Sequence, residues 1–412
     1  MGLDGVLPWQ QARQVAGAAG RPLPGTSARL DEAGGSVLDR NMVTVQDDPA
    51  EDSAAVSGFA VCGEGPWQVD DLDALTPGWA APVDFRMPIP RHTDAVIARE
   101  NATVRDRPDR RPELMQHDPL TGIPDERVRP DLGEGILRQG SISEAGHLLV
   151  PADALVTPAI LSLAAARGLD ELDVIRPPVV GVLVLGSQLL DRGLPRQGRV
   201  RDALRHAVPA FVGALGARGN PAVRAPDSPD LLLQEIDDAN VDILITTGST
   251  APDPDNHLRR VLGDLNARWL VDGVAVTPGA QMLLAKLPDG RFLVGLPGDP
   301  VSALAGLVTL ASPLVRALRG DPVTGHPRSA VLMDDTTPAD FADDTALVPV
   351  QLEVSAAATQ ARPLAHSGPG GLEGWARADA IAVVPPGAGM RGDVVELLDS
   401  YGRDRWPAPG GR

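Results

Sequence analysis

The sequence predicts a multidomain α/β protein built around a mostly parallel β-sheet. Between Val179 and Leu318, apolar runs typical of buried strands alternate with segments whose apolar residues recur at helical spacing. This alternation is the pattern of a parallel sheet whose faces are covered by helices. On either side, short apolar segments lie between prolines and glycines, which predicts smaller β-rich domains. A chain of 412 residues is long enough for about two to four domains.

The charge balance excludes several classes of partner. The formal net charge of −18 argues against general nucleic-acid binding and against binding to anionic membranes. Lys286 is the only lysine among 37 basic residues, so lysine chemistry and lysine–phosphate contacts are nearly excluded. Aromatic residues make up only 3% of the chain, and alanine, valine and leucine must therefore fill the cores.

The sequence further predicts a soluble cytoplasmic protein without disulfides. Cys62 is the only cysteine, and we expect it to be a small core residue rather than a nucleophile. The first residues lack the basic and apolar regions of a signal peptide, and no apolar run is expected to reach the length of a membrane span. The seven histidines show no metal-ligand spacing; His257 and His366 adjoin predicted loops, where a ligand contact and an ordinary surface position are both open.

The elements that precede the central sheet are predicted from the prolines, glycines and cap residues that delimit them. Pro8–Ala19 is predicted to be a helix, which the prolines and glycine of RPLPGTS (21–27) end. Residues 57–104 come in short apolar segments between prolines and glycines, as in a small β-rich module. Thr157 as N-cap and Gly168 as stop signal predict a helix over residues 158–167.

The central region alternates strand and helix. A continuous β-branched run marks its first buried strand, and the turn Pro288-Asp289-Gly290 marks a hairpin. Ligands of such sheets bind at the carboxyl ends of the strands, where we expect the loops GSTAPDPDN (248–256) and LPGDP (296–300). The predicted strands are 179–186, 241–245, 269–276 and 292–296, and the predicted helices are 200–218, 231–239, 256–265 and 301–318.

The chain after Gly320 is predicted to form a small β domain. Its short apolar strands, 330–333, 346–354 and 380–384, are separated by turns rich in proline, glycine and aspartate. Residues 368–374, GPGGLEG, are expected to form a glycine-rich loop.

The LPGDP turn has the composition of an anion site. Gly298 permits a tight turn, Asp299 is a good N-cap and Pro300 suits the first position of a helix. Free backbone N–H groups and the positive end of the helix dipole would favour phosphate there. The same residues also suit a strand–turn–helix joint that binds nothing, and both interpretations stay open.

Six segments, in order along the chain, carry a family resemblance that no single one would establish. They are AVSGFAV (55–61), TDAVIARE (93–100), VVGVLVLGSQLL (179–190), TTGSTAPDPDN (246–256), LPGDPVSA (296–303) and LEGWARADAIAVVP (372–385). Together they resemble the motifs of the molybdopterin molybdenumtransferase family, which includes MoeA and the gephyrin E domain.

This resemblance implies an architecture and an activity. Residues 178–324 would form a three-layer α/β/α, Rossmann-like, molybdopterin-binding domain. Residues 1–46 with 137–177 would form an extended α+β linker domain, residues 47–136 an inserted β-rich domain, and residues 325–405 a small C-terminal β domain. Members of the family insert molybdate into adenylylated molybdopterin with Mg²⁺ and form homodimers, so the resemblance implies these substrates, this metal and a homodimer.

The chemistry of the family carries over less well than its fold. At two positions where the family motifs have carboxylates, this chain has Ser57 and Gln188, and where they have two lysines it has Thr277 and Ala280. Serine and glutamine do not replace carboxylates as hard metal ligands. Positive charge for an anion would have to come from arginines such as those at 259–260.

Two aspartates of the loop after the second central strand, Asp253 and Asp255, are the candidate catalytic residues and Mg²⁺ ligands, together with a phosphate. The alternative is that they cap a helix and repel anions. Ser57 and Gln188 occupy degenerate catalytic positions. The candidate ligand-binding residues are Thr247, Gly248, Ser249, Thr250, Pro297, Gly298, Asp299, Ser302, Gly370 and Gly371.

Three functions are therefore open. The first is an enzyme of molybdenum-cofactor biosynthesis that acts on a phosphorylated pterin, which the retained Asp253 and Asp255 favour. The second is a catalytically degenerate paralogue that binds a pterin, a nucleotide or a partner protein without turnover, which Ser57 and Gln188 favour. The third is a related α/β protein for another phosphorylated small molecule.

Overall fold

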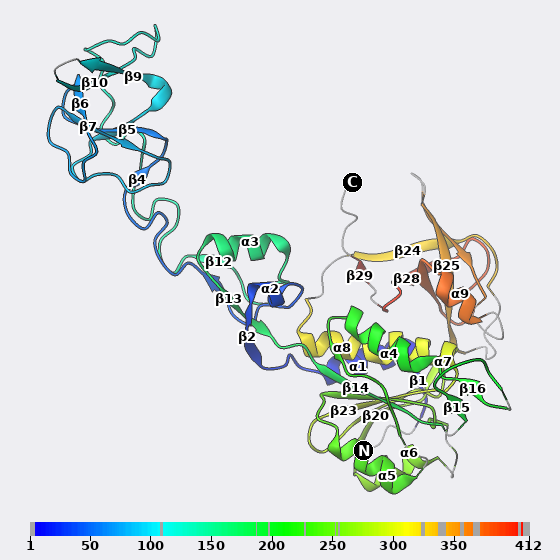
Figure 1. Cartoon of the computed structure of the whole chain (residues 1–412). Coiled ribbons are helices and arrows are strands. Elements are labelled where there is room, and N and C mark those ends of the chain that lie inside the picture. Colours follow the sequence, from blue (N-terminus) through cyan, green and yellow to red (C-terminus); the bar gives the residue numbers. More distant parts are fainter. Residues whose placement is uncertain are drawn as a thin grey trace. The chain divides into compact units, whose positions relative to one another are not determined.

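The computed structural model resolves two compact units (Figure 1). The first unit comprises Met1–Arg40, Ala152–Leu161 and Glu171–Arg412, and the second comprises Asn41–Pro151 and Ser162–Asp170. This division is coarser than the four predicted domains, whose limits stay predictions. The residues that the structure describes are 5–107, 110–186, 188–196, 198–225, 228–251, 253, 256–322, 326–336, 343–354, 358–365, 371–402 and 405–406.

The second unit is centred on a six-stranded sheet, which confirms the β-rich module. Its strands are β5 (Gly58–Cys62), β6 (Trp67–Val69), β7 (Trp79–Val83), β8 (Ala95–Ala98), β9 (Ala102–Arg107) and β10 (Arg110–Gln116), with a short 3₁₀ helix at Arg99–Asn101. They lie in the order β8-β5-β7-β6-β10-β9, and only β6 and β7 are parallel neighbours. Successive residues of β5 face opposite sides, so Cys62 packs in one small core and Val61 in another. Cys62 is thus buried in a core, as predicted.

The first unit contains the predicted α/β sheet. Its strands are β14 (Val179–Val184), β17 (Arg218–Gly219), β18 (Val223–Arg224), β19 (Ile243–Thr247), β20 (Arg268–Asp272), β22 (Leu283–Lys286) and β23 (Phe292–Leu296). They lie in the order β17-β14-β19-β23-β22-β20, and β18 also pairs with β14. The pairs from β17 to β23 are parallel, whereas β22 and β20 are antiparallel. The sheet is therefore mostly parallel, and the hairpin at 288–290 joins β22 to β23 as predicted.

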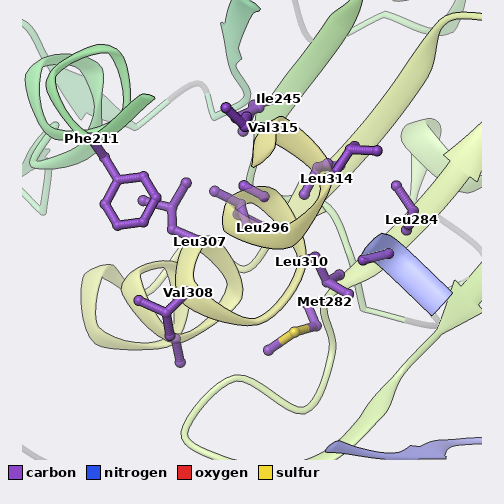
Figure 2. Packing of buried hydrophobic residues seen from close by; sticks show 14 of the residues in the cluster. Phe211, Ile245, Met282, Leu284, Leu296, Leu307, Val308, Leu310, Leu314 and Val315 are labelled. Carbon is purple, nitrogen blue, oxygen red and sulfur yellow. The ribbon is translucent and has the colours of Figure 1, made fainter. Parts of the chain in front are cut away.

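Helices cover both faces of this sheet. They are α1 (Trp9–Ala19), α4 (Leu204–Ala214), α5 (Pro229–Asp238), α6 (His257–Asp264), α7 (Pro300–Gly306) and α8 (Ser312–Arg319). Helices α1, α4, α7 and α8 share one hydrophobic cluster with Ile245, while α5 and α6 share another with its neighbour Leu244. Figure 2 shows the first cluster, in which Leu307 and Leu310, from the turn that joins α7 to α8, lie among Phe211, Met282 and Leu296. The alternation along β19 is what a strand buried on both faces requires.

Helix α7 continues through a π-helical turn at Leu307–Ala311 into α8, and the result is one 20-residue helix, Pro300–Arg319. Its mean hydropathy of 1.7 and its length are those of a membrane span, so the expectation that no apolar run is long enough was wrong. Proline, serine, threonine and arginine residues interrupt its apolar sequence, so it contains no long uninterrupted apolar run. In this structure 72% of the most apolar 18-residue part of this helix is buried inside the protein, as in the core helix of a globular domain.

Side chains of α1 hold the π-helical turn. The indole N–H of Trp9 donates to the hydroxyl of Thr309 at 3.1 Å, and both residues are buried. The Arg13 guanidinium donates to the backbone carbonyls of Val308 and Gly402, the latter at 2.8 Å. In a π-helical turn the carbonyls lack their regular i→i+4 partners, and the Arg13 guanidinium is a hydrogen-bond donor to one of these carbonyls, that of Val308.

The chain after Gly320 closes into a small β-barrel. Its strands are β24 (His326–Leu332), β25 (Thr345–Val354), β26 (Thr359–Pro363), β27 (Ala380–Val384), β28 (Val394–Leu398) and β29 (Arg405–Trp406), with helix α9 (Gly371–Arg377). Pairing runs from β25 through β26, β24, β28 and β27 and back to β25. Alanine, valine and leucine side chains fill the interior, which agrees with the scarcity of aromatic residues.

Short elements complete both units. In the first unit β2 (Gly25–Arg29) pairs with β13 (Glu171–Ile175) next to α2 (Leu30–Ala33), β1 (Leu7–Pro8) pairs with β21 (Val274–Thr277), and β15 (Leu189–Leu190) pairs with β16 (Val200–Arg201). In the second unit β3 (Met42–Val43) pairs with β12 (Leu148–Val150), and β4 (Ser53–Ala54) pairs with β11 (Ile136–Leu137). Helix α3 (Pro158–Ala166) matches its prediction.

Two central elements differ from their predictions. The predicted strand 269–276 is two strands, because Gly273 at φ +89° turns the chain between β20 and β21 and sends them to different sheets. The predicted helix 200–218 is α4 alone. It begins at Leu204, since the carboxylate of Asp202 accepts the N–H groups of Leu204 and Arg205 at 2.9 and 3.0 Å, and it ends before Gly216 at φ +79°.

The predicted glycine-rich loop 368–374 also needs correction. Residues 371–374 are the first turn of α9, where Gly371 and Gly374 are buried. At Gly374 a Cβ atom would lie 1.8 Å from the carbonyl oxygen of Ala365, so glycine is required by close packing rather than by a loop. Residues 368–370 lie outside the described part of the chain.

Candidate functional site

Three loops of the α/β sheet open at the same edge. In the parallel register Val184 of β14 lies beside Thr247 of β19, which lies beside Leu296 of β23. These three residues end their strands, so the segments that follow them all leave from the carboxyl edge. The expected meeting of the loops 248–256 and 296–300 is therefore confirmed.

Glycines let these loops approach each other closely. Gly248 has φ +91°, and a Cβ atom there would lie 2.9 Å from the carbonyl oxygen of Leu185, in the loop after β14. A Cβ atom on Gly298 would lie 3.5 Å from the Cα atom of Gly248. Any side chain at position 248 would push the first two loops apart, so this position requires glycine.

Of the three hydroxyl residues predicted at the second loop, Thr247, Ser249 and Thr250, only Ser249 faces solvent. Thr247 and Thr250 are buried, and the Thr250 methyl group packs on Gly295, where a Cβ atom would come within 3.1 Å of it. Ser249 is exposed and holds φ +55°, a conformation that non-glycine residues adopt rarely. Thr247 and Thr250 therefore shape the loop, and Ser249 is the hydroxyl left for a ligand.

The LPGDP turn has the predicted helix cap. The carboxylate of Asp299 accepts the backbone N–H of Ser302 at 2.8 Å, and Pro300 is the first residue of α7. Pro297 is buried, whereas Gly298 and Asp299 are exposed. The Asp299 carbonyl also accepts the N–H of Ala303, so of the first N–H groups of the helix that of Val301 remains, and the Asp299 carboxylate places a negative charge beside it.

The segment 277–281 lies against the start of α7. Gly279 has φ +106°, and a Cβ atom there would lie 2.9 Å from the carbonyl oxygen of Ser302. The Thr277 hydroxyl donates to the carboxylate of Asp344 at 3.3 Å, and Ala280 is exposed. This segment therefore reaches the site, but its side chains bring no positive charge.

The structure describes only one of the two candidate metal ligands, Asp253. The Asp253 N–H donates to the carbonyl of Ala251 at 2.8 Å in the loop before α6, and Asp255 lies outside the described residues. Asn256 caps α6 by accepting the N–H groups of Leu258 and Arg259, and its amide donates to Ala251 at 2.7 Å. Among the residues that the structure describes, no three His, Cys, Asp or Glu side chains are placed to hold a metal ion.

Of the two arginines at 259–260, Arg259 already binds other residues of the chain. The Arg259 guanidinium donates to both carboxylate oxygens of Asp272 at 2.6 and 3.1 Å and to the carbonyl of Thr250 at 3.1 Å. It also stacks over Trp269, 5.4 Å from the ring centre. Arg260 is exposed, 3.9 Å from Asp264. Arg259 therefore stabilises the loop at Thr250 rather than facing a ligand.

The remaining predicted residues are spread over the chain. Ser57 belongs to the second unit, where its hydroxyl accepts the N–H of Phe85 at 2.9 Å. Gln188 lies in the first unit, exposed at the base of the loop after β14, and its carbonyl accepts the N–H of Val200. Gly371 begins α9, and His257 begins α6. Gly370 and His366 lie outside the described residues.

The sequence interpretation missed the charges of the loop after β14. Residues 192–205 carry five arginines and a single carboxylate, Asp202, in a chain whose net charge is −18. The signal was the local density of arginine along residues 192–205. Arg192, Arg196 and Arg199 are exposed on this loop.

A half-buried ion pair fixes the opposite end of β14 and β19. Arg176 donates twice to Asp242 at 2.7 Å, and the N–H of Val179 donates to the same carboxylate at 2.8 Å. Burial by itself raises the pKa of Asp242, but the hydrogen bonds from Arg176 and Val179 outweigh it and hold this pKa below its ordinary value. The pair anchors the strand starts and leaves the carboxyl edge for a ligand.

Two family models match this chain. A model of the MoeA N-terminal region, domains I and II, matches residues 7–168, and a model of a probable molybdopterin binding domain matches residues 181–317. The second model covers residues 181–184 of β14, all of β19 and β23, and the three loops that follow these strands.

Curated relatives are similar over part of their length. The molybdopterin molybdenumtransferase of Staphylococcus aureus (strain Mu50) is 26% identical over 271 residues, which are 64% of this chain and 64% of that protein. The one of a Nostoc species is 25% identical over 311 residues, 70% of this chain and 68% of that protein. The chain thus matches less than two thirds of the length of the Staphylococcus relative.

Solved structures share the fold over nearly the whole chain. A crystal structure of the molybdopterin biosynthesis MoeA protein from Pyrococcus horikoshii has a TM-score of 0.73 at 23% identity, and the match covers 96% of this chain and 99% of that one. A second structure of MoeA from the same species has a TM-score of 0.64 at 20% identity, covering 95% and 99%. The solved structures show the shared fold, and the two family models, which together match most of the chain, show the family: the chain belongs to the MoeA family.

Proposed function

We propose that this protein is a molybdopterin molybdenumtransferase that binds a phosphorylated pterin at the carboxyl edge of its α/β sheet and inserts molybdate into it. The observation that carries this proposal is the meeting of the three loops after β14, β19 and β23 beside the start of a 20-residue helix. Family membership supplies the reaction, and the loops supply a place for its anionic substrate.

The groups at this edge suit an anion. The long helix begins at this edge; Pro300 has no N–H and those of Ser302 and Ala303 donate to Asp299, which leaves the N–H of Val301 for a ligand. Ser249, in the loop after β19, is exposed at the same edge. The close packing of Gly248 against Leu185 and Gly298 leaves backbone rather than side chains facing the edge. A phosphate approaches such a surface closely, as in other glycine-rich phosphate sites.

Magnesium does not fit the described residues well enough to enter the reaction scheme. A protein site for Mg²⁺ needs carboxylate oxygens, usually one or two together with substrate phosphates. Asp253 is the only predicted metal ligand in the described part of the chain, and no group of three suitable side chains accompanies it there. We therefore assign no step to this ion, although the assay below contains it.

A second function, binding without turnover, is favoured by two specific observations. Ser57, at a position where the family motif has a carboxylate, is uncharged and its hydroxyl is used by the N–H of Phe85. Gln188, at another such position, is also uncharged. A paralogue with these substitutions would hold a pterin or nucleotide for another protein rather than transform it.

Assembly and location follow from the family and are proposals as well. We propose a homodimer in the cytoplasm. Light scattering during gel filtration measures the mass of the assembly against the 43.0 kDa of one chain. A single peak at the mass of one chain at micromolar concentration would contradict the dimer.

Reconstitution separates the two functions. The purified full chain is incubated with adenylylated molybdopterin, Mg²⁺ and molybdate, and active cofactor is measured by its ability to activate a cofactor-free molybdoenzyme. The transferase proposal expects cofactor to form in proportion to the protein, and boiled protein serves as the control. Tight pterin binding without transfer would replace it by the second function, and neither binding nor transfer would refute both.

A further inference from the structure

We propose that Arg192, Arg196 and Arg199, on the loop after β14, form an anion site that binds the phosphate groups of the small-molecule ligand held at the carboxyl edge. The inference rests on the proposed function for the location of that ligand. It assigns to arginine a role that lysine cannot fill in this chain, because Lys286 is the only lysine and its ammonium group lies over the ring of Phe292.

The loop is strongly positive in an acidic protein. Its two neighbouring carboxylates are both occupied: Asp191 pairs with Arg205 at 2.7 Å and with Arg224 at 3.2 Å, and Asp202 caps α4. Among the residues that the structure describes, no carboxylate pairs with the side chains of Arg192, Arg196, Arg199 or Arg201. Four guanidinium groups therefore remain for a partner outside the chain.

Hydrogen bonds hold the base of the loop. Strands β15 and β16 pair at its base, where the N–H of Asp202 donates to the carbonyl of Leu190 at 3.0 Å. Arg224, next to β14 in the sheet, donates to the carbonyl of Leu189 at 2.9 Å. Because these bonds order the base of the loop, the arginines above it lose less conformational freedom when they bind.

Arg196 and Arg199 face each other across a tight turn. The N–H of each donates to the carbonyl of the other, at 3.2 and 2.9 Å, and Gly198 in the turn has φ +72°. Directly opposed residues of an antiparallel pair project their side chains to the same side. Two like charges in this position repel each other, and an anion bound between them removes the repulsion.

The position of the loop indicates the kind of anion. It leaves β14 at the edge where the loops after β19 and β23 also open. This shared edge is the reason to assign its arginines to the phosphate groups of the proposed pterin ligand. Arg259, at the same edge, is engaged by Asp272 and is not available. Guanidinium groups bind phosphate through paired hydrogen bonds, and two of them on one side of a turn suit a phosphate or diphosphate group.

Titration of the full chain with inorganic pyrophosphate tests the site. The probe carries the proposed chemistry and no pterin, and binding is measured by calorimetry at two salt concentrations. The double variant Arg196→Ala/Arg199→Ala is expected to bind pyrophosphate about tenfold more weakly than the wild-type protein and with a smaller salt dependence. Both side chains are exposed and the turn is held by backbone bonds, so the melting temperature should not change.

The matched control is Arg105→Ala/Arg110→Ala, which removes the same charge from exposed arginines of the second unit. Equal weakening in both double variants would show an effect of net charge and overturn the site, as would a wild-type protein that binds no pyrophosphate. Molybdopterin binding by the same variants separates the two proposals. If the wild-type protein binds pterin and Arg196→Ala/Arg199→Ala binds it equally well, the arginine site is wrong and the proposed function stands. If pyrophosphate binding depends on the loop but pterin never binds, the proposed function fails alone.

Discussion

Replacement of Asp299 by asparagine should increase affinity for a phosphorylated ligand at the carboxyl edge. Asparagine caps helices about as well as aspartate, so the hydrogen bond to the N–H of Ser302 at 2.8 Å should be retained. What changes is the charge, because Asp299 is exposed at the start of the long helix, next to the Val301 N–H proposed to face the ligand. Removing a negative charge from such a position should favour an incoming anion.

The magnitude follows from the exposure of the carboxylate. Two like charges about 4 Å apart repel each other by about 1 kcal/mol in a water-like dielectric, which corresponds to about fivefold in a dissociation constant. The unliganded protein should lose about 0.3–1 kcal/mol, because the helix dipole loses the favourable charge at its positive end. Affinity should therefore rise about fivefold for Asp299→Asn while unfolding stability falls slightly.

The assay is titration of the wild-type protein and the variant with molybdopterin at low and physiological salt. The affinity gain should shrink as salt increases, because the repulsion is screened. Asp299→Ala serves as the control, since it removes the charge and also the cap, and it should cost about 1 kcal/mol of stability. Equal affinities of the wild-type protein and Asp299→Asn at low salt would refute the reasoning and leave the turn a structural joint.

Three further outcomes are expected. Trp9→Phe deletes the indole hydrogen bond to the buried Thr309 hydroxyl, and urea unfolding should show a loss of about 1–2 kcal/mol; an unchanged midpoint would contradict this. Asp242→Asn removes a carboxylate whose pKa is held low, a contribution that is complete above about pH 3.9 and disappears as the pH falls through the folded pKa. The variant should therefore be less stable than the wild-type protein at pH 7 and should lose less stability on acidification; parallel stability–pH curves would refute this. Burial, with the nearby Asp94 carboxylate, raises the pKa of the Cys62 thiol, so iodoacetamide at pH 7.5 should alkylate it only after denaturation, as counted by mass spectrometry.

Much of the fold was accessible from the sequence because burial leaves a periodic record. The strands β14, β19 and β23 are continuous apolar runs, since both of their faces are covered. Helix α6, predicted over residues 256–265, begins at His257 with Asn256 as its cap. The split between β20 and β21 was not accessible. Leu270 to Val276 reads as one apolar strand, and only the partners on either side show that Gly273 separates two sheets.

The candidate site was only partly accessible. The loops at the edge could be placed because parallel strands end together. The roles of individual side chains could not, because they depend on contacts between distant parts of the chain. Arg259 looks available in the sequence, yet Asp272 holds it. Thr250 looks like a hydroxyl ligand, yet it packs on Gly295.

The turn at Gly273 has a consequence for attempts to isolate the parts of this protein. Strand β21, directly after this turn, pairs with β25 of the barrel on one side and with β1 on the other. A fragment that ends before the barrel would leave one side of β21 without hydrogen-bond partners and open to pairing with other copies. Truncation near residue 325 should therefore yield an aggregating product, whereas a fragment that keeps both sheets should stay in solution. Because β21 pairs with strands of both regions, a fragment boundary should not separate the α/β region from the barrel.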